Sequence, residues 1–248
     1  MLFRSIMALP KVLVCTPTSF TKDYCFKEWI ENVINFTYPN FDIYICDNTA
    51  FEENPNYSNY IKEYLADNYT KPVKITYLLI HGANLLQRIA LTHEECRGYC
   101  VQKDYDYMLH LESDVFPPTD IIERLLWNNK DVCGAVYYTD EGANRKAVLQ
   151  RIVELSDNKD DIVSINFEPT EDIGFMDGAV KQVGHVGLGC VLIKKEVLEK
   201  IQFRYDLLYP QHSADSFFAN DLYDLNIPIF ADTSLVVKHK NRKWINLT

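Results

Sequence analysis

The sequence predicts an α/β fold with a mostly parallel central sheet flanked by helices and a smaller antiparallel region. Three observations indicate this class. Apolar β-branched runs alternate with helically periodic segments in the first half, polar clusters follow several of these runs, and the second half contains shorter, less regular segments. Such alternation is typical of parallel sheets with right-handed crossovers. Because no repeat or Gly/Pro-rich linker interrupts the chain, we expect one domain over residues 1–248.

Strands and helices alternate strictly in the first half. Strands are identified by short apolar, β-branched runs bounded by polar or turn-forming residues, and helices by apolar residues that recur every three or four positions. A polar loop, Thr16-Pro17-Thr18, is expected after the first strand. The predicted order is strand Lys11–Cys15, helix Asp23–Phe36, strand Phe41–Cys46, helix Asn56–Asp67, strand Val73–Ile80, helix Asn84–Gln102 and a strand that begins at Tyr107.

The second half has shorter segments in a less regular order. Residues 139–182 are polar and irregular, and within them Arg151–Val153 and Ile162–Phe167 are expected to form antiparallel edge strands. The other predicted elements are helix Pro118–Asn128, strand Val132–Tyr138, the stretch Val183–Ile193 in which glycines precede an apolar strand, helices Lys194–Ile201 and Ser213–Leu225, and short strands Ile229–Ala231 and Leu235–Val237.

The stretch Tyr107–Pro118, YMLHLESDVFPP, contains the most specific pattern in the chain. An apolar strand runs directly into Glu112-Ser113-Asp114, and alternation along that strand would place Glu112 and Asp114 on one face. Buried carboxylates are costly unless they are paired or bound to a metal, and oxygen ligands suit Mg²⁺ or Mn²⁺. The alternative is a solvated acidic loop after a core strand, and the spacing alone leaves both open.

Polar clusters follow four of the predicted strands. They are Thr16–Thr18, Asp47-Asn48, His81-Gly82 and Glu112–Asp114. Ligands of open α/β sheets bind beyond the carboxyl ends of the strands. Each cluster alone would be an ordinary loop, but their shared position predicts a site at this edge of the sheet.

Composition limits the partners of the chain. A net charge of −10 argues against a large nucleic-acid surface, which requires a basic face, but it leaves room for an anionic small ligand at a local site. Because no apolar run approaches the ~20 residues of a membrane span, we expect no transmembrane segment. Seven scattered cysteines, an odd number, suit a reducing compartment, so we expect a cytoplasmic protein. The sequence leaves homo-oligomerisation open.

Taken together, these features resemble the GT-A glycosyltransferases, especially the family-2-like branch, over roughly Lys11–Lys240. LESDVFPP resembles the D-x-D element of that fold, in which acids hold a divalent cation against a nucleotide diphosphate. Asp114 matches directly, whereas Glu112 stands in the first acidic place with a longer side chain. VVKHK places His239 where many relatives supply a histidine. The resemblance therefore implies Mn²⁺ or Mg²⁺ bound by Glu112, Asp114 and His239, and an imidazole ligand favours Mn²⁺ somewhat.

Weaker matches imply the residues that bind the donor. KVLVCTPT resembles the first strand and the nucleotide-contacting loop of the family, and Asp47 stands where the family commonly has an acid that contacts the base. Arg88 resembles an arginine at the start of the helix before D-x-D, although the usual A-R-N string is here Gln87-Arg88-Ile89. A basic residue after the last strand would neutralise phosphate, with a solvated basic tail as the alternative. The implied UDP-sugar contacts are Thr16, Thr18, Asp47, Arg88, Ser113 and Lys240.

The glycine-rich stretch VGHVGLGC resembles the acceptor-side loop of the family. This implies that His185, Gly187 and Gly189 contact the acceptor, although His185 could equally be a packed histidine. Aromatic side chains elsewhere could stack on a sugar, but we expect core packing for each of Trp127, Trp244, Tyr137 and Tyr138.

SADSFFANDL resembles the family's E-D-x-x-F helix start. Asp215 occupies the aspartate position, which is the catalytic base in inverting members, and Ala214 replaces the glutamate. The residues alone offer a simpler explanation for this acid, because a carboxylate in the first turn interacts favourably with the helix dipole. His239 has a similar alternative as a packed or solvent-facing histidine.

The resemblance implies a metal-dependent glycosyltransferase that moves a sugar from a UDP-sugar to a hydroxyl of a glycan, protein or small-molecule acceptor, by preference with inversion. Residues 10–118 would form its nucleotide-binding half and 119–248 its acceptor-binding half. Two alternatives stay open. A nucleotidyltransferase of related fold would require a glycine-rich phosphate loop with a basic residue after the first strand, and TPTSFTKD has no glycine. A non-catalytic GT-A-like binding protein would account for the departures at Glu112 and Ala214.

Overall fold

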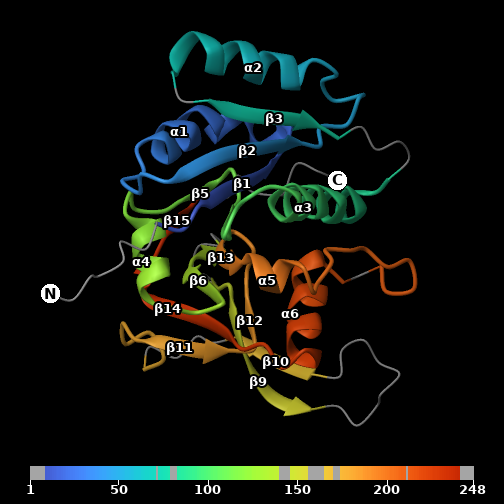
Figure 1. Cartoon of the computed structure of the whole chain (residues 1–248). Helices are drawn as coiled ribbons and strands as arrows, with labels where there is room; N and C mark the ends of the chain where they lie inside the picture. The colour runs from blue at the N-terminus through green and yellow to red at the C-terminus, as the bar shows by residue number, and fades with distance from the viewer. Residues whose placement is uncertain are drawn as a thin grey trace, which may run out of the picture.

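The computed structural model describes residues 9–70, 72–78, 83–139, 146–155, 165–169, 174–210 and 212–240. An eight-stranded sheet forms its centre (Figure 1), and all strands except β11 and β13 run in the same direction. The predicted mostly parallel α/β sheet is therefore confirmed. The strand order is β11 (Val180–Val183), β14 (Ile229–Val236), β6 (Val132–Val136), β13 (Cys190–Lys194), β4 (Tyr107–Leu111), β1 (Val12–Thr18), β2 (Phe41–Asp47) and β3 (Val73–Tyr77).

Helices cover both faces of this sheet, because each face carries its own apolar cluster. One cluster contains residues of α1 (Asp23–Ile34), α2 (Tyr57–Asn68) and α4 (Ile121–Trp127). The other contains residues of α3 (Leu85–Gln102), α5 (Lys195–Leu198) and α6 (Ala214–Asp224). The arrangement is a three-layer sandwich with the sheet in the middle.

The central strands are apolar on both faces, which explains their uninterrupted apolar sequences. In β1, Val12 and Val14 belong to one cluster, whereas Leu13 and Cys15 belong to the other. Each side chain is fully buried. Burying such a side chain contributes roughly 1.5–3 kcal/mol, so a run of this kind strongly favours a central strand over an edge strand.

Short antiparallel strands make up the smaller region. β9 (Leu149–Leu155) pairs with β10 (Ile165–Pro169) and with β12 (His185–Val186), which confirms the predicted antiparallel strands in this region. Two further antiparallel pairs join β7 (Tyr138–Thr139) to β8 (Lys146–Ala147) and β5 (Val115–Phe116) to β15 (Lys238–His239).

Three predictions about individual segments were wrong. Thr16–Thr18 does not form a loop, because the pairing of β1 with β2 continues to Thr18 opposite Asp47. The two short strands predicted near the C-terminus form one strand, β14, with a register shift between Asp232 and Val236. Trp127 does not pack in the core, because its position at the end of α4 leaves it 89% exposed. His81-Gly82 and Trp244 lie outside the described residues.

The central sheet continues across the predicted boundary near residue 118. β4, from the first half, pairs with β13, from the second half, and β13 pairs with β6. The assignment of the two halves to nucleotide and acceptor stays a prediction. In the part of the chain that the structure describes, no helix is long and apolar enough to cross a membrane. All seven cysteines are buried and free.

Candidate metal and ligand site

A cavity of about 410 Å³ opens at the ends of β1 and β4. This is the sheet edge at which the sequence predicts a ligand site. Six segments line it: the end of β1 with the 3₁₀ helix η1 (Phe20–Lys22), the segment after β2, the first turns of α3, the turn after β4, the start of α6, and β15. The polar side chains of its lining include Thr18, Lys22, Asn48, Arg88, His93, Glu112, Ser113, Asp215 and His239.

The acidic turn after β4 supplies the carboxylates. β4 ends at Leu111, and the amide of Glu112 donates to the Gly189 carbonyl at 3.0 Å. The chain then turns, with the Val115 amide donating to the Glu112 carbonyl at 3.0 Å. The predicted strand alternation through Glu112 and Asp114 was therefore wrong. A turn, and not a strand face, brings the two acids together.

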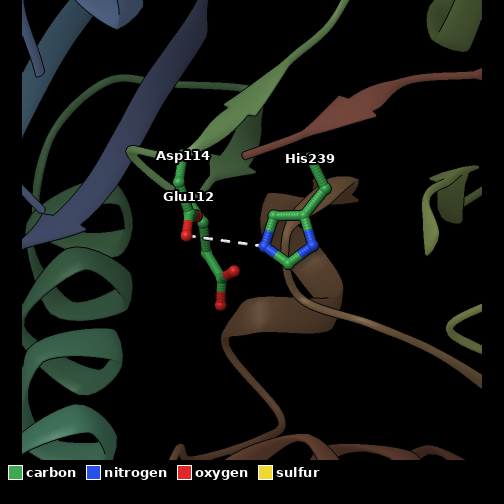
Figure 2. Close-up of side chains that lie close together, drawn as sticks. All are labelled: Glu112, Asp114 and His239. Atoms are coloured by element: carbon green, nitrogen blue, oxygen red, sulfur yellow. Dashed lines mark ion pairs between the residues drawn. The ribbon is translucent and has the colours of Figure 1, made fainter. Parts of the chain in front are cut away.

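His239 reaches the acidic turn through the β5–β15 ribbon, in which it lies opposite Val115. The Lys240 amide donates to the Asp114 carbonyl at 2.8 Å and fixes the two segments to each other. Figure 2 shows the side chains of Glu112, Asp114 and His239 gathered at one place, and one ligand atom from each lies within 4.8 Å of the others. The His239 Nε2 to Asp114 Oδ2 distance is 3.4 Å.

The chemistry of this cluster fits a divalent cation. Asp114 is fully buried, and its Oδ1 has no hydrogen-bond partner among the described residues, so it is left for a ligand. His239 Nδ1 lies 3.1 Å from the Tyr138 carbonyl, which can only accept, so the proton belongs on Nδ1 and Nε2 faces the carboxylates. Such a backbone contact is the usual way to orient a metal-binding imidazole. Two carboxylates and one imidazole suit Mn²⁺ or Mg²⁺.

Burial and mutual charge shift the pKa of every member of the cluster. Burial, followed by the negative charge of Asp114, raises the pKa of Glu112 to about 7. Burial also disfavours the charged forms of Asp114 and His239, but their mutual hydrogen bond and opposite charges outweigh it. The pKa of Asp114 is therefore lowered and that of His239 is raised.

Lys22 is a member of this site that the sequence analysis missed. Its ammonium group donates a hydrogen bond to Asp114 Oδ2, the same oxygen that faces His239. Burial opposes its charge, but the charges of Asp114 and Glu112 prevail and raise its pKa. Its position in the sequence could have indicated this role, because Lys22 is the first basic residue after the first strand.

Three of the predicted donor residues line the cavity. Thr18 and Ser113 lie side by side, with their hydroxyl oxygens 3.1 Å apart, and Arg88 lies 3.9 Å from Glu53. The Arg88 Nε is buried without a hydrogen-bond partner among the described residues, which leaves it for a ligand. These side chains offer hydroxyl and guanidinium groups to a polar, anionic ligand.

The other three predicted donor residues lie outside the lining. Thr16 is buried in β1 with its hydroxyl on the Pro17 carbonyl. Both carboxylate oxygens of Asp47 are engaged, by Thr49 and by Ser58 at 2.5 Å, whereas the neighbouring Asn48 lines the cavity. The Lys240 ammonium pairs with Glu28.

Asp215 lines the same cavity as Glu112, and it lies in the first turn of α6 as the helix-terminus alternative also requires. Its Oδ2 accepts a hydrogen bond from the Leu188 amide at 3.3 Å. The negative charge of Asp215 contributes to the raised pKa of Glu112. Asp215 is thus held beside the acidic cluster and in contact with the glycine-rich stretch.

The glycines of the predicted acceptor loop have a packing explanation. A Cβ atom would lie 2.1 Å from Tyr137 Oη at Gly187 and 2.5 Å from Tyr137 Cζ at Gly189. The Gly189 amide donates to the Tyr137 hydroxyl at 3.0 Å. His185 is buried and, like both glycines, lies outside the cavity lining. Contact of these three residues with an acceptor stays a prediction.

A pair of buried histidines lies behind the cavity and was not predicted. His110, on β4, places its Nδ1 2.5 Å from the Leu188 carbonyl and its Nε2 2.6 Å from His93 Nδ1. The carbonyl can only accept, so His110 carries its proton on Nδ1, and His93 must then donate from its own Nδ1. His93 lines the cavity.

Comparisons with known proteins support the fold. No protein-family model and no curated protein sequence matches the chain. Among solved structures, the chain is similar to GalNAc-T7 crystallised with UDP, GalNAc and Mn²⁺, with a TM-score of 0.63, 13% identity, and coverage of 95% of this chain and 45% of that one. A second similarity, to A197 from STIV, has a TM-score of 0.47 at 17% identity, covers 93% of this chain and 86% of that one, and supports no inference. The chain has a GT-A-like fold and spans less than half of the GalNAc-T7 chain.

Proposed function

We propose that the chain is a metal-dependent glycosyltransferase that moves a sugar from a UDP-sugar to a hydroxyl acceptor with inversion. The observation that carries the proposal is the meeting of Glu112, Asp114 and His239 beside a cavity that also contains Asp215. The similarity to the fold of a protein solved with UDP, GalNAc and Mn²⁺ supports the choice of donor and metal. Within the proposal, the motif resemblance favours the family-2-like branch.

The proposal assigns a separate task to each group in the cavity. Glu112, Asp114 and His239 would hold the cation, which as a Lewis acid would stabilise the leaving diphosphate. Arg88, Thr18 and Ser113 would bind the donor from the same cavity. Asn48, which lines the cavity beside the predicted Asp47, would contact the nucleotide on this side.

Asp215 would act as the general base. The acceptor oxygen attacks the anomeric carbon, the bond from that carbon to the diphosphate oxygen breaks, and the hydroxyl proton passes to the Asp215 carboxylate. One positioned base contributes typically about 10²–10⁴-fold to a rate. The contact with the Leu188 amide holds the carboxylate in place.

Calorimetry with a panel of UDP-sugars, with and without Mn²⁺, tests the donor half of the proposal. We expect binding that depends on the metal. An absence of nucleotide binding under every metal condition would contradict the proposal. Asp232→Asn is a suitable control, because Asp232 is a buried acid in β14 that bonds Asn128 and Ser234 away from the cavity.

One observation favours the nucleotidyltransferase alternative. Lys22 is the basic residue that such an enzyme requires after the first strand, although no glycine accompanies it. The products separate the two reactions. A glycosyltransferase releases UDP from a UDP-sugar, whereas transfer of the nucleotidyl group releases a sugar phosphate. A non-catalytic protein would bind UDP and Mn²⁺ and release neither product.

A further inference from the structure

We propose that Lys22 and the divalent cation compete for Asp114, so that Lys22 is a built-in counter-ion that leaves when the metal binds and moves to the donor diphosphate. The inference rests on the proposed function, because it takes the Glu112, Asp114 and His239 cluster as the metal site.

The competition follows from the contacts of a single carboxylate. Lys22 donates to Asp114 Oδ2, and His239 Nε2 lies 3.4 Å from the same oxygen. A dication on either oxygen of Asp114 would lie within a few ångströms of the ammonium group. Like charges at such distances repel strongly where water is largely excluded. Both cations therefore cannot occupy this carboxylate together.

Lys22 serves a charge-balancing role in the absence of a metal. Glu112, Asp114 and Asp215 bring three carboxyl groups to one region, and Asp114 is fully buried. A buried carboxylate without a counter-charge is expensive. The Lys22 ammonium group therefore stabilises these carboxyl groups until a divalent cation binds.

The position of Lys22 allows it to move. Its side chain is 27% exposed and extends from η1, at the rim between β1 and α1, into the cavity. Four rotatable bonds let the ammonium group swing without a change in the backbone. Thr18, Ser113 and Arg88 line the same cavity, so a bound diphosphate would lie within its reach.

This exchange predicts cooperative binding of metal and nucleotide. The metal alone must displace Lys22 from Asp114 without a bound phosphate to attract the ammonium group. With UDP present, the displaced ammonium group gains a phosphate partner. By linkage, UDP and Mn²⁺ must raise each other's affinity by the same factor, and part of that factor should depend on Lys22.

The test is a titration of the protein with Mn²⁺, in which electron paramagnetic resonance reports free Mn²⁺, with and without UDP. We expect Lys22→Met to bind Mn²⁺ alone at least about tenfold more tightly than the wild type and to show a smaller enhancement by UDP. Lys27→Met is the matched control. Lys27 lies in α1, which begins directly after Lys22, and its ammonium group packs on the rings of Tyr60 and Tyr64. Lys22→Gln repeats the test with a polar side chain, and a thermal melt verifies folding.

The outcomes separate the two proposals. Equal or weaker Mn²⁺ binding by Lys22→Met and Lys22→Gln, with binding by the wild type intact, would overturn the exchange and leave the metal site standing. Failure of the wild type and of both variants to bind Mn²⁺ or UDP would overturn both ideas. Mn²⁺ binding by the variants but not by the wild type would support the exchange, because Lys22 would then exclude the metal.

Discussion

Two buried groups of titratable side chains lie at the end of β4, and their charges differ. The acidic turn joins Glu112 and Asp114 to His239 and Lys22, and opposite charges are in direct contact. Among the described residues, the hydrogen-bond partners of His93 and His110 are each other's imidazole and the Leu188 carbonyl. Desolvation therefore prevails there, lowers the pKa of His110 to about 4 and holds the pKa of His93 well below its usual value.

The difference shows that burial alone does not determine charge at this site. His239 is partly buried beside Asp114 and its pKa is raised, whereas His110 is fully buried and its pKa is lowered. An opposite charge within hydrogen-bond distance decides the sign. The two regions therefore differ chemically: a charged one that would suit a cation and a diphosphate, and a neutral one beside the cavity, which His93 lines.

Asp215 belongs to both regions, and its substitution should have the largest effect. Its charge acts on Glu112 and on His110, and it lines the cavity. Asp215→Asn keeps the shape but removes the base, so we expect kcat of sugar transfer to fall about 10³-fold. Steady-state kinetics with the donor found by calorimetry measures this.

The affinity of Asp215→Asn for UDP should stay within about threefold of that of the wild type, because the predicted donor-binding side chains are unchanged. Turnover close to that of the wild type would show that Asp215 is a structural carboxylate at the helix terminus.

Asp114→Asn tests the charged region alone. Loss of the ligand charge should weaken Mn²⁺ binding by at least about 100-fold, because even indirect partners of a metal ligand typically contribute 10–100-fold. Equilibrium dialysis with Mn²⁺ measures the change, with Asp232→Asn as the control. Unchanged Mn²⁺ affinity in Asp114→Asn would place the metal elsewhere.

Acidification tests the neutral region. His110 has a pKa of about 4 in the fold against about 6.5 in the unfolded chain, so its unfolded form takes up a proton first as the pH falls. The contribution of His110 to the free energy of unfolding is fully present above about pH 6.5 and declines toward pH 4. The expected loss between pH 7 and pH 5 is about 2 kcal/mol. Urea unfolding at several pH values measures it.

The comparison with His110→Gln isolates that contribution. His239, whose pKa is raised, changes stability with pH in the opposite direction, but it is present in both proteins and so does not affect their difference. The variant should lose less stability on acidification than the wild type. If the free energy of unfolding fell equally with pH in the two proteins, His110 would not be held neutral in the fold.

The glycine-rich stretch connects the two regions and should give the smallest effects. Leu188 donates its amide to Asp215 and accepts from His110, and Gly187 and Gly189 flank it. Gly187→Ala places a Cβ against Tyr137 and should destabilise the protein by about 1–3 kcal/mol. Gly98→Ala is the contrast, because its Cβ meets only Gln102 at 4.0 Å in α3 and should stabilise by about 0.5–1 kcal/mol. Thermal melts compare the two.

The sequence by itself determined the layers and the edge at which the site lies. Short β-branched apolar runs such as Val12–Cys15 favour buried central strands, and helical periodicity is a local property, so both can be recognised in the sequence without knowledge of the contacts. Glu112 and Asp114 follow a predicted strand, which is also a local feature, whereas Asp215 and His239 were indicated by the resemblance to the GT-A glycosyltransferases. All four side chains meet at the site.

Only the tertiary structure decided which polar residues reach the cavity. The β1–β2 pairing continued through Thr18 and buried Thr16, and the Asp47 carboxylate is bonded by Thr49 in the following loop and by Ser58 of α2. Lys22 is separated from Asp114 by 92 residues and His93 from His110 by 17, and no pattern of spacing reports such pairs. Whether a buried side chain is charged depends on the group that lies beside it in the fold. That neighbour is known only once the strands and helices are assembled.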